Sequence, residues 1–440
     1  MCRRIWRVSI VCTASASLVI FMQWLKEHRD SLWMALAVGM AAGFVLAGYE
    51  FIRNPSNTLY VQMYGKERLA FIMGLVPVGV FILLYLYSRL LSVLGPKHTL
   101  IWSTVICLSA ILSGWKALQW GWAPAAGFLY VFRSAYVVLL IEQYWSLINT
   151  SLTQSDAKRF NGLICGIASI GAVLGGMFGE RLTMIYGTVD MVAVAAILTA
   201  PAGLLSLWAY SKASVVAAKS NRAEELVNAS KPKGTHLAWE LFAKQPTLVY
   251  ILILVLMTQS IVTALGITFQ SFLQDAMPNA DAQTSYGFRF YTWVNALAGV
   301  GQFVLTPILL SRFSMRFVQV SMPTVVFSCS VYAVMFPGLE SAGLALLLFK
   351  ALDYSVFRAA KEVFYVPMSF DARFRAKEVI DILGYRTGKG LSGALFDVIQ
   401  RLGVAMTAVT YGVWSAVFSI AWILCALKLT SSKNGETQET

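Results

Sequence analysis

Long hydrophobic runs separated by short polar segments dominate the chain. A helix that crosses a bilayer needs about 20 predominantly apolar residues, and twelve runs of this kind occur in the 440-residue sequence. We place them at 31–53, 67–92, 98–119, 125–149, 160–183, 188–210, 246–270, 286–311, 316–337, 341–366, 378–401 and 406–428. The pattern predicts an all-α membrane protein with twelve transmembrane helices.

A polar segment in the middle of the chain divides these runs into two groups. We predict an N-terminal six-helix half (31–210), a cytoplasmic basic linker (211–245) with a short amphipathic piece at 222–227, a C-terminal six-helix half (246–428) and a polar cytoplasmic tail (429–440). Residues 1–30 fit a signal peptide, an extra span or a start-site artefact before Met22. Basic residues on both flanks disfavour the extra span, so we interpret this segment as an amphipathic or artefactual leader.

Composition and charge support a membrane location. Hydrophobic residues make up 58% of the chain and charged residues only 13%, whereas soluble proteins average about 25% charged residues. The net charge of +13 comes mainly from basic residues in the loops after even-numbered spans, and this distribution places both termini in the cytoplasm. Six plus six helices around a basic central loop is the layout of the major facilitator superfamily. We expect a bacterial inner-membrane protein.

Charged residues inside the apolar C-terminal segments provide the main evidence on function. Each charge in hydrocarbon costs roughly 3 kcal/mol, so such residues are expected to line a polar path. Helical spacing predicts that Lys350, Tyr354, Phe357 and Lys361 share one face, and that Asp381, Tyr385 and Lys389 share another. Clustered cations favour phosphates, and tyrosine rings can stack on a purine. The electrostatics therefore predict an anionic solute.

The same segments resemble a known family. Residues 354–368 read Y-S-V-F-R-A-A-K-E-V-F-Y-V-P-M, and residues 373–389 read R-F-R-A-K-E-V-I-D-I-L-G-Y-R-T-G-K. Both are similar to motifs of the nucleotide transporter family, the ATP/ADP translocases of intracellular bacteria and plastids. In the first half, A-K-R-F at 157–160 and I-R at 52–53 ahead of N-T-L at 57–59 add weaker matches. The resemblance implies a major facilitator-like fold and nucleotide transport of the NTP/NDP exchange type.

Two positions depart from the family pattern. A lysine that the family exchangers are thought to use aligns with Ser56, and an acidic or amide residue aligns with Thr150. These departures favour the alternative of a different transported anion.

The candidate site residues follow from the charge pattern and the resemblance together. For substrate binding we propose Arg386, Lys389, Lys361, Tyr385, Tyr354, Lys350, Arg53, Arg133 and Arg289, and for coupling or gating Asp381, Glu142, Glu362, Arg358, Lys158 and Asp397. Ion pairs that lock helix ends are the alternative for Arg358 and Glu362. Snorkelling at helix ends is the alternative for Arg133, Arg289 and Lys350.

The spacing of small residues and of cysteines indicates how helices pack and whether metal or disulfide sites are expected. Gly171, Gly175 and Gly179 repeat every four residues, as do Gly384, Gly388 and Ser392, and such rows predict close helix packing rather than binding. The six cysteines form no Cys-x-x-Cys pair, so the sequence indicates neither a metal nor a disulfide framework. We expect no cofactor.

We therefore interpret the chain as a secondary active transporter of nucleotides or a related phosphorylated anion. It would work by alternating access, through exchange or proton symport. Alternatives are a major facilitator-type permease for another organic anion and, in a different class, a non-transporting membrane receptor or assembly factor. No recognisable catalytic motif occurs, so we expect no enzyme. The expected partners are a small anionic substrate and the lipid bilayer, without nucleic acid, for a protein that functions as a monomer.

Overall fold

The computed structural model describes residues 28–152, 154–219, 242, 245–368 and 377–436. The proposed leader up to residue 27 and the amphipathic piece at 222–227 lie outside the described residues. In the described part of the first half, the helices are α2 (Arg29–Tyr64), a short η1 (Lys66–Arg68), α3 (Leu69–Gln119), α4 (Pro124–Ser151), α5 (Gln154–Tyr186) and α6 (Thr188–Lys219).

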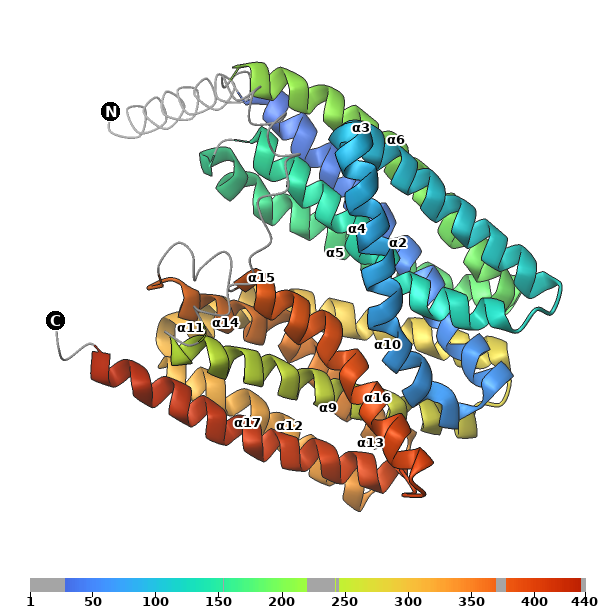
Figure 1. Ribbon diagram of the computed structural model, residues 1–440, viewed down its shortest axis with the longest axis vertical. Helices are drawn as coiled ribbons and strands as arrows, with labels where there is room; N and C mark the ends of the chain where they lie inside the picture. The colour runs from blue at the N-terminus through green and yellow to red at the C-terminus, as the bar shows by residue number, and fades with distance from the viewer. Residues whose placement is uncertain (1–27, 153, 220–241, 243–244, 369–376, 437–440) are drawn as a thin grey trace, which may run out of the picture.

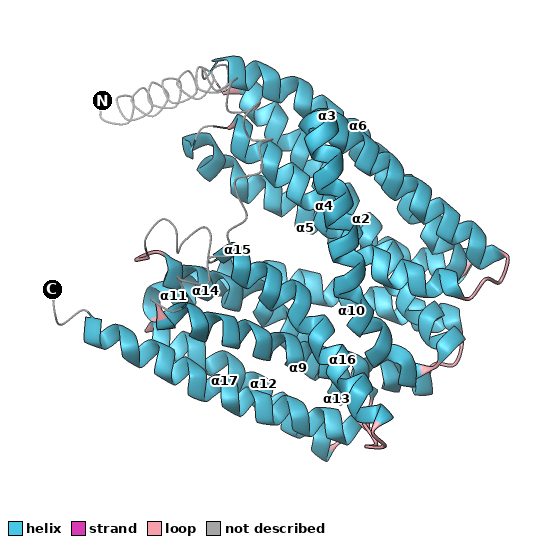
Figure 2. Ribbon diagram, viewed as in Figure 1, coloured by secondary structure: helices cyan, strands magenta, loops and turns pink. Residues whose placement is uncertain are grey.

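The second half contains shorter helices joined by π-helical turns. Its elements are α9 (Pro246–Ala276), α10 (Ala280–Val300), η2 (Gly301–Leu305), α11 (Thr306–Arg312), α12 (Met315–Met335), α13 (Leu339–Leu352), η3 (Asp353–Phe357), α14 (Arg358–Tyr365), α15 (Lys377–Ile380), η5 (Asp381–Thr387), α16 (Gly388–Arg401) and α17 (Ala408–Glu436). Figure 2 shows helices throughout both groups. The prediction of an all-α protein is confirmed for the described part of the chain.

Among the described residues, nine helices are long and apolar enough to cross a membrane. The chain is therefore a multi-pass membrane protein. The count differs from the predicted twelve for two physical reasons. The stretch Lys66–Gln119 counts once, although Gly95 inside it has non-helical backbone angles (φ 73°) and is followed by Pro96. The predicted spans 341–366 and 378–401 are divided by η3 and η5 into short helices. The twelve-span count stays a prediction.

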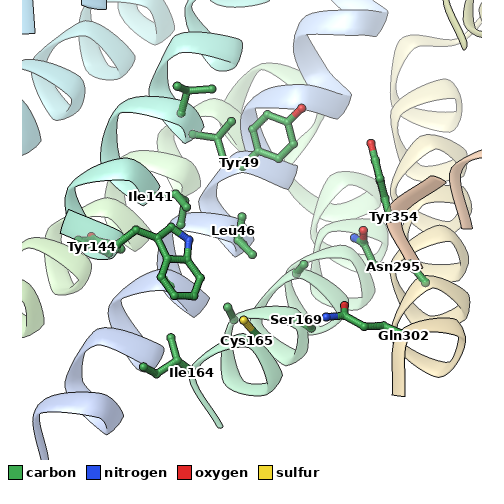
Figure 3. A pocket seen from close by; sticks show the side chains of 18 of the residues that line it. Leu46, Tyr49, Ile141, Tyr144, Ile164, Cys165, Ser169, Asn295, Gln302 and Tyr354 are labelled. Atoms are coloured by element: carbon green, nitrogen blue, oxygen red, sulfur yellow. The ribbon is translucent and has the colours of Figure 1, made fainter. Parts of the chain in front are cut away.

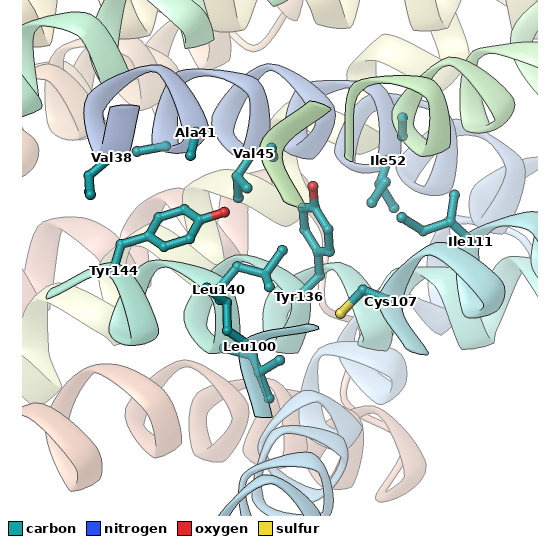
Figure 4. Close-up of a cluster of buried hydrophobic side chains, with 14 of the residues drawn as sticks. Val38, Ala41, Val45, Ile52, Leu100, Cys107, Ile111, Tyr136, Leu140 and Tyr144 are labelled. Carbon is teal, nitrogen blue, oxygen red and sulfur yellow. The ribbon is translucent and has the colours of Figure 1, made fainter. Parts of the chain in front are cut away.

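The helices pack as two groups that follow the chain order (Figure 1). In the first group α2 packs against α4, α5 and α6, and α3 packs against α4 and α6. In the second group α9 packs against α13, α16 and α17, and α12 packs against α17. Each group has its own hydrophobic core; part of the first core, including Leu140 and Tyr136, is shown in Figure 4. The contacts between groups are made mainly by α10 against α5 and α2, and by α16 against α3.

The predicted glycine rows lie at these helix contacts. A Cβ at Gly171 would overlap the backbone of Gly43 on α2, and one at Gly175 would lie 2.8 Å from the Cα of Ala47. A Cβ at Gly384 would lie 2.6 Å from Val255 Cγ1 on α9. Their interpretation as packing surfaces is confirmed, because any side chain at these positions would push neighbouring helices apart.

Polar contacts close one end of the interface between the groups. Lys66 Nζ lies 2.5 Å from Asp275 Oδ1 at the end of α9. Asp281 Oδ1 on α10 accepts hydrogen bonds from the backbone N of Thr188 (2.6 Å) and from its Oγ1 (2.7 Å), so it caps α6 from the opposite group. The two groups diverge toward the other end, where α2 begins and α17 ends (Figure 1).

Candidate substrate-binding site

Two adjoining cavities lie where the groups meet. The larger has a volume of about 550 Å³ and is bordered by α2, α4, α5, α10 and the η2–η3 region. The smaller has a volume of about 100 Å³ and lies between α2, α4, α9, α10, α13 and α16. Tyr49, Arg53 and Tyr354 line both cavities. In Figure 3 Tyr49 lies on one side of the larger cavity, and Tyr354 and Asn295 lie on the other.

Cations and tyrosines converge on the smaller cavity. Its charged lining consists of four cations, Arg53, Arg133, Lys350 and Lys389, and four tyrosines, Tyr49, Tyr130, Tyr291 and Tyr354, also border it. No carboxylate of the described residues is part of this lining. Of the four cations, Arg53 pairs with Glu50 outside this lining. The remaining positive charge would repel within the cavity, so an anion bound there would relieve that repulsion.

Arg53 is held from both groups. It forms an ion pair with Glu50 one turn earlier on α2, and its guanidinium carbon lies 3.4 Å from the centre of the Tyr291 ring on α10. Its Nε is buried and has no hydrogen-bond partner among the described residues. The same is true of Gln270 Nε2, which also lines the smaller cavity. Both atoms are N–H donors, which is the complement an anion requires.

Arg133 on α4 is fixed by α2. Its Nη1 donates to the Arg53 carbonyl oxygen (2.7 Å), to Ser56 Oγ (3.0 Å) and to Asn57 Oδ1 (2.7 Å). The Tyr130 ring lies beneath it, with its centre 3.8 Å from the guanidinium carbon. Arg133 is 6% exposed, so it is a buried member of the site. Snorkelling to the membrane surface does not account for it.

The two lysines come from the second group. Lys350 Nζ donates to the Tyr354 hydroxyl at 3.2 Å and lies 5.6 Å from the centre of the Tyr291 ring. Lys389 borders the smaller cavity from the start of α16. No carboxylate of the described residues lies within ion-pair distance of the Lys350 or Lys389 ammonium group. These two cations therefore have the greatest freedom to bind a ligand.

Other predicted site residues form ion pairs beside the cavities. Lys361 Nζ lies 2.7 Å from Asp381 Oδ1, and Lys377 Nζ lies 2.6 Å from Glu362 Oε2. Both pairs link the α13–α14 segment to the α15–α16 segment. None of these four residues lines either cavity.

Axial distance along the spans and two π-helical turns separate these residues from the smaller cavity. The faces predicted from α-helical spacing assume about 3.6 residues per turn, whereas a π turn has i to i+5 hydrogen bonds and shifts the later residues around the axis. Lys350 precedes η3 and Tyr354 lies within it, and both border the smaller cavity. Lys361 lies beyond η3, roughly 16 Å farther along the helix than Lys350 at 1.5 Å per residue, and does not border it. Asp381 and Tyr385 lie within η5, whereas Lys389 follows it on α16.

The remaining predicted site residues whose side chains are described lie apart from the smaller cavity. Arg358 and Glu142 line the larger cavity, and Arg358 lies 5.0 Å from the centre of the Tyr354 ring. Arg289 is exposed beside Tyr286, and Asp397 pairs with Arg401 at 2.8 Å. Neither Arg289 nor Asp397 borders a cavity. The side chains of Arg386 and Lys158 lie outside the described residues.

Several residues that line the cavities are not among those predicted from the sequence. These are Glu50, Tyr49, Tyr130, Tyr291 and Asn295. For Glu50 a signal exists, because a carboxylate in an apolar span three residues before an arginine marks a buried charged pair. The tyrosines give no such signal, since aromatic residues are common in membrane spans.

The arrangement of helices defines the protein class. A solved structure of a mutant of the nucleoside transporter NupG superposes with a TM-score of 0.65 and 13% identity, covering 90% of this chain and 99% of that one. The fold is therefore similar to that of solved major facilitator-type transporters.

Sequence comparisons lead to one family within this class. Residues 341–432 match the family model described as TLC ATP/ADP transporter. The ADP,ATP carrier protein 3 of Rickettsia bellii (strain RML369-C) is 19% identical, covering 82% of each chain. The ADP,ATP carrier protein 1 of Chlamydia muridarum (strain MoPn / Nigg) is 21% identical, covering 92% of this chain and 84% of the relative. These matches confirm the resemblance to the nucleotide transporter family.

Proposed function

We propose that this protein carries a nucleotide or a related phosphorylated anion across the bacterial inner membrane by alternating access. The observation that supports this most is the convergence of Arg53, Arg133, Lys350 and Lys389 on one cavity between the two helix groups. Nucleoside di- and triphosphates carry roughly three to four negative charges near neutral pH. Four cations are a suitable complement, and guanidinium and ammonium groups form strong charge-assisted hydrogen bonds to phosphate oxygens.

The adjoining larger cavity suits the remainder of such a solute. Its lining is mostly apolar, with Trp145, Tyr49, Tyr144 and Tyr354 as aromatic members and Asn295 and Gln302 as amides. Aromatic rings can stack on a base and amides can hydrogen-bond its edge. The relatives are named as carriers of ADP and ATP, which supports the nucleotide class over other anions.

The closed end of the interface supports alternating access. The contacts of Lys66 with Asp275 and of Thr188 with Asp281 lie on the side away from the start of α2 and the end of α17. With both termini in the cytoplasm, as the basic loops predict, this arrangement is closed toward the outside and open toward the cytoplasm. Transport then requires these contacts to break and the opposite ends to meet.

Uptake by the reconstituted protein tests the proposal. Proteoliposomes would be supplied separately with radiolabelled ATP, ADP, NAD and inorganic phosphate, with and without unlabelled solute inside. We expect saturable uptake of at least one nucleotide. Replacing both Lys350 and Lys389 with Gln should lower kcat/KM by about 10²- to 10⁴-fold, since each of the two lost charge-assisted contacts to phosphate contributes about 1.5–3 kcal/mol.

The matched control is Arg401→Gln, which removes a cation outside both cavities. It should transport at the wild-type rate. Stimulation by internal solute would establish exchange, and uptake driven by an imposed pH gradient would establish proton symport. If neither wild type nor control moves any of the four solutes, nucleotide transport is the wrong assignment.

The mostly apolar lining of the larger cavity also favours a second candidate, a permease for another organic anion. A carboxylate or sulfonate with a bulky apolar body would fit both cavities. This candidate predicts that non-phosphorylated anions compete for binding where nucleotides do not, and a thermal-shift screen with both classes separates the two.

A further inference from the structure

A buried carboxylate connects the two helix groups at the wall of the larger cavity. Glu50 is 2% exposed. Its Oε2 pairs with Arg53 and accepts a hydrogen bond from Asn54 Nδ2 at 3.3 Å. Its Oε1 accepts from Asn295 Nδ2 on α10 at 3.0 Å. Glu50 therefore contacts both Arg53 within its own group and Asn295 of the opposite group.

Arg53 is shared between Glu50 and the ligand cavity. It is the one cation of the described residues that lines both cavities. Its guanidinium contacts Glu50 and lies over the Tyr291 ring. A phosphorylated anion in the smaller cavity competes directly with Glu50 for this guanidinium, and a phosphate with more than one negative charge is the stronger competitor.

Loss of Arg53 would leave Glu50 as a buried charge with amide donors alone. An ionised carboxylate in a low-dielectric site is strongly disfavoured without a cation, and such groups become neutral by taking up a proton. Water in the cavity that opens beside Glu50 can deliver that proton.

Asn54 offers a place for the added hydrogen. Its Oδ1 is buried and has no hydrogen-bond partner among the described residues, although its Nδ2 already contacts Glu50. Rotation of the amide by half a turn exchanges the oxygen and the nitrogen, and it breaks the hydrogen bond that Asn54 Nδ2 donates to the Glu50 carbonyl oxygen at 3.1 Å. Asn54 then accepts a hydrogen bond from a protonated Glu50, where it donated one to the carboxylate.

We propose that Glu50 is the proton-binding group that couples proton movement to anion transport. The anion binds Arg53, and the Glu50 carboxylate takes one proton from water, forming an O–H bond directed at Asn54. When the anion leaves, Arg53 returns to Glu50 and the same proton is released to water. No electrons are transferred, and a proton accompanies the anion. The proposal rests on the proposed function and assigns its coupling site.

Other titratable or charged groups surround the same cavities from the neighbouring elements. They are Tyr49 on α2, Tyr130, Arg133, Glu142 and Tyr144 on α4, Cys165 on α5, Tyr291 on α10, Lys350 on α13, Tyr354 on η3, Arg358 on α14 and Lys389 on α16, with Asp353 buried on η3. The test must therefore assign the proton to Glu50 by substitution.

Calorimetry that counts protons during binding provides this test. ADP, ATP, NAD and inorganic phosphate would each be titrated into the purified full-length protein at pH 8, in buffers of different ionisation enthalpy. At this pH the free phosphates are already ionised. We expect uptake of about one proton for each anion bound to wild type, by linkage between the two equilibria. Glu50→Gln should bind the anion with equal or higher affinity and take up no proton.

Two further variants complete the design. Glu340→Gln removes an exposed carboxylate from the first turn of α13, outside both cavities, and should match wild type. Asn54→Leu removes the acceptor but leaves the pair of Glu50 with Arg53, so it should reduce proton uptake. Asn54→Leu provides the assignment if Glu50→Gln fails to fold.

The outcomes separate this proposal from the proposed function. Anion binding by wild type without proton uptake would overturn the coupling role and leave nucleotide transport standing. Full proton uptake by Glu50→Gln or Asn54→Leu would assign the proton elsewhere and overturn it equally. Absence of binding by all four anions would contradict the proposed function itself, and the coupling role with it.

Discussion

At the scale of single residues, the four cations of the smaller cavity differ in how the protein holds them. Arg133 is fixed by three acceptors on α2, and Arg53 is fixed by Glu50 and the Tyr291 ring. Lys350 has one hydrogen bond, to Tyr354. Arg133 therefore shapes the cavity, Arg53 can exchange its contact with Glu50 for one with a ligand, and Lys350 and Lys389 can move toward a ligand.

Substitutions at Tyr291 test whether its ring holds Arg53. Tyr291→Phe keeps the aromatic face and should leave the apparent affinity for the anion within about twofold of wild type. Tyr291→Leu removes a cation–π contact of about 0.5–2 kcal/mol and should raise KM by about 2- to 30-fold, because Arg53 loses its orientation. Uptake measured over a range of solute concentrations gives both values. Equal KM values for the Phe and Leu variants would show that the ring has no such role.

At the scale of helices, close packing and π turns decide which residues meet. Small residues allow α5 to approach α2 at Gly171 and Gly175. The turns η3 and η5 rotate the later parts of their spans. In both cases the path of the backbone determines which side chains come together.

A pair of glycine substitutions on α5 tests the packing. Gly171→Ala places a methyl group against the Gly43 backbone, and such overpacking costs about 1–3 kcal/mol. We expect a lower midpoint of thermal unfolding in detergent. Gly166 lies on the same helix with nothing within 4 Å of an added Cβ, so Gly166→Ala should leave the midpoint unchanged or raise it through the helix propensity of alanine. Equal destabilisation by both variants would contradict the proposed contact.

The helices and most of the cations of the smaller cavity can be predicted from sequence. The contacts that bring these residues together in the fold cannot. Hydropathy finds the helical segments because the bilayer imposes a length and an apolar composition. It also marks Arg53, Arg133, Lys350 and Lys389, since charges in such segments are conspicuous. It cannot reveal that Lys361 pairs with Asp381, because the two residues lie on separate spans that only tertiary packing brings together. Glu50 and Asn295 come together only through tertiary packing.

At the scale of the whole molecule, one end of the interface is closed by contacts that bridge the groups. Asp281 caps α6 from the opposite group, and Lys66 pairs with Asp275. Capping interactions contribute about 0.5–2 kcal/mol, so a few of them can decide which end of the transporter is closed.

Removal of the cap on α6 should shift this balance. Asp281→Asn loses the charged acceptor for Thr188, and we expect the closed end to open in a larger fraction of molecules. The control is Asp190→Asn, because Asp190 Oδ1 accepts a hydrogen bond from Trp115 Nε1 at 3.0 Å, within the first group. Spin-label distances across the closed end measure the two populations. A population with a longer spin-label distance should appear for Asp281→Asn and not for Asp190→Asn. If it does not appear, the contact between Asp281 and Thr188 does not hold this end closed.

The most direct test of the central claim is transport by a protein whose closed end is locked. Lys66→Cys and Asp275→Cys would be joined by a short thiol-reactive crosslinker that a reducing agent cleaves, since the native side chains meet at 2.5 Å. Single-cysteine variants treated in the same way serve as controls. We expect the crosslinked protein in proteoliposomes to lose uptake of the labelled anion and to regain it after reduction. Undiminished uptake through the locked protein would contradict alternating access between the two helix groups.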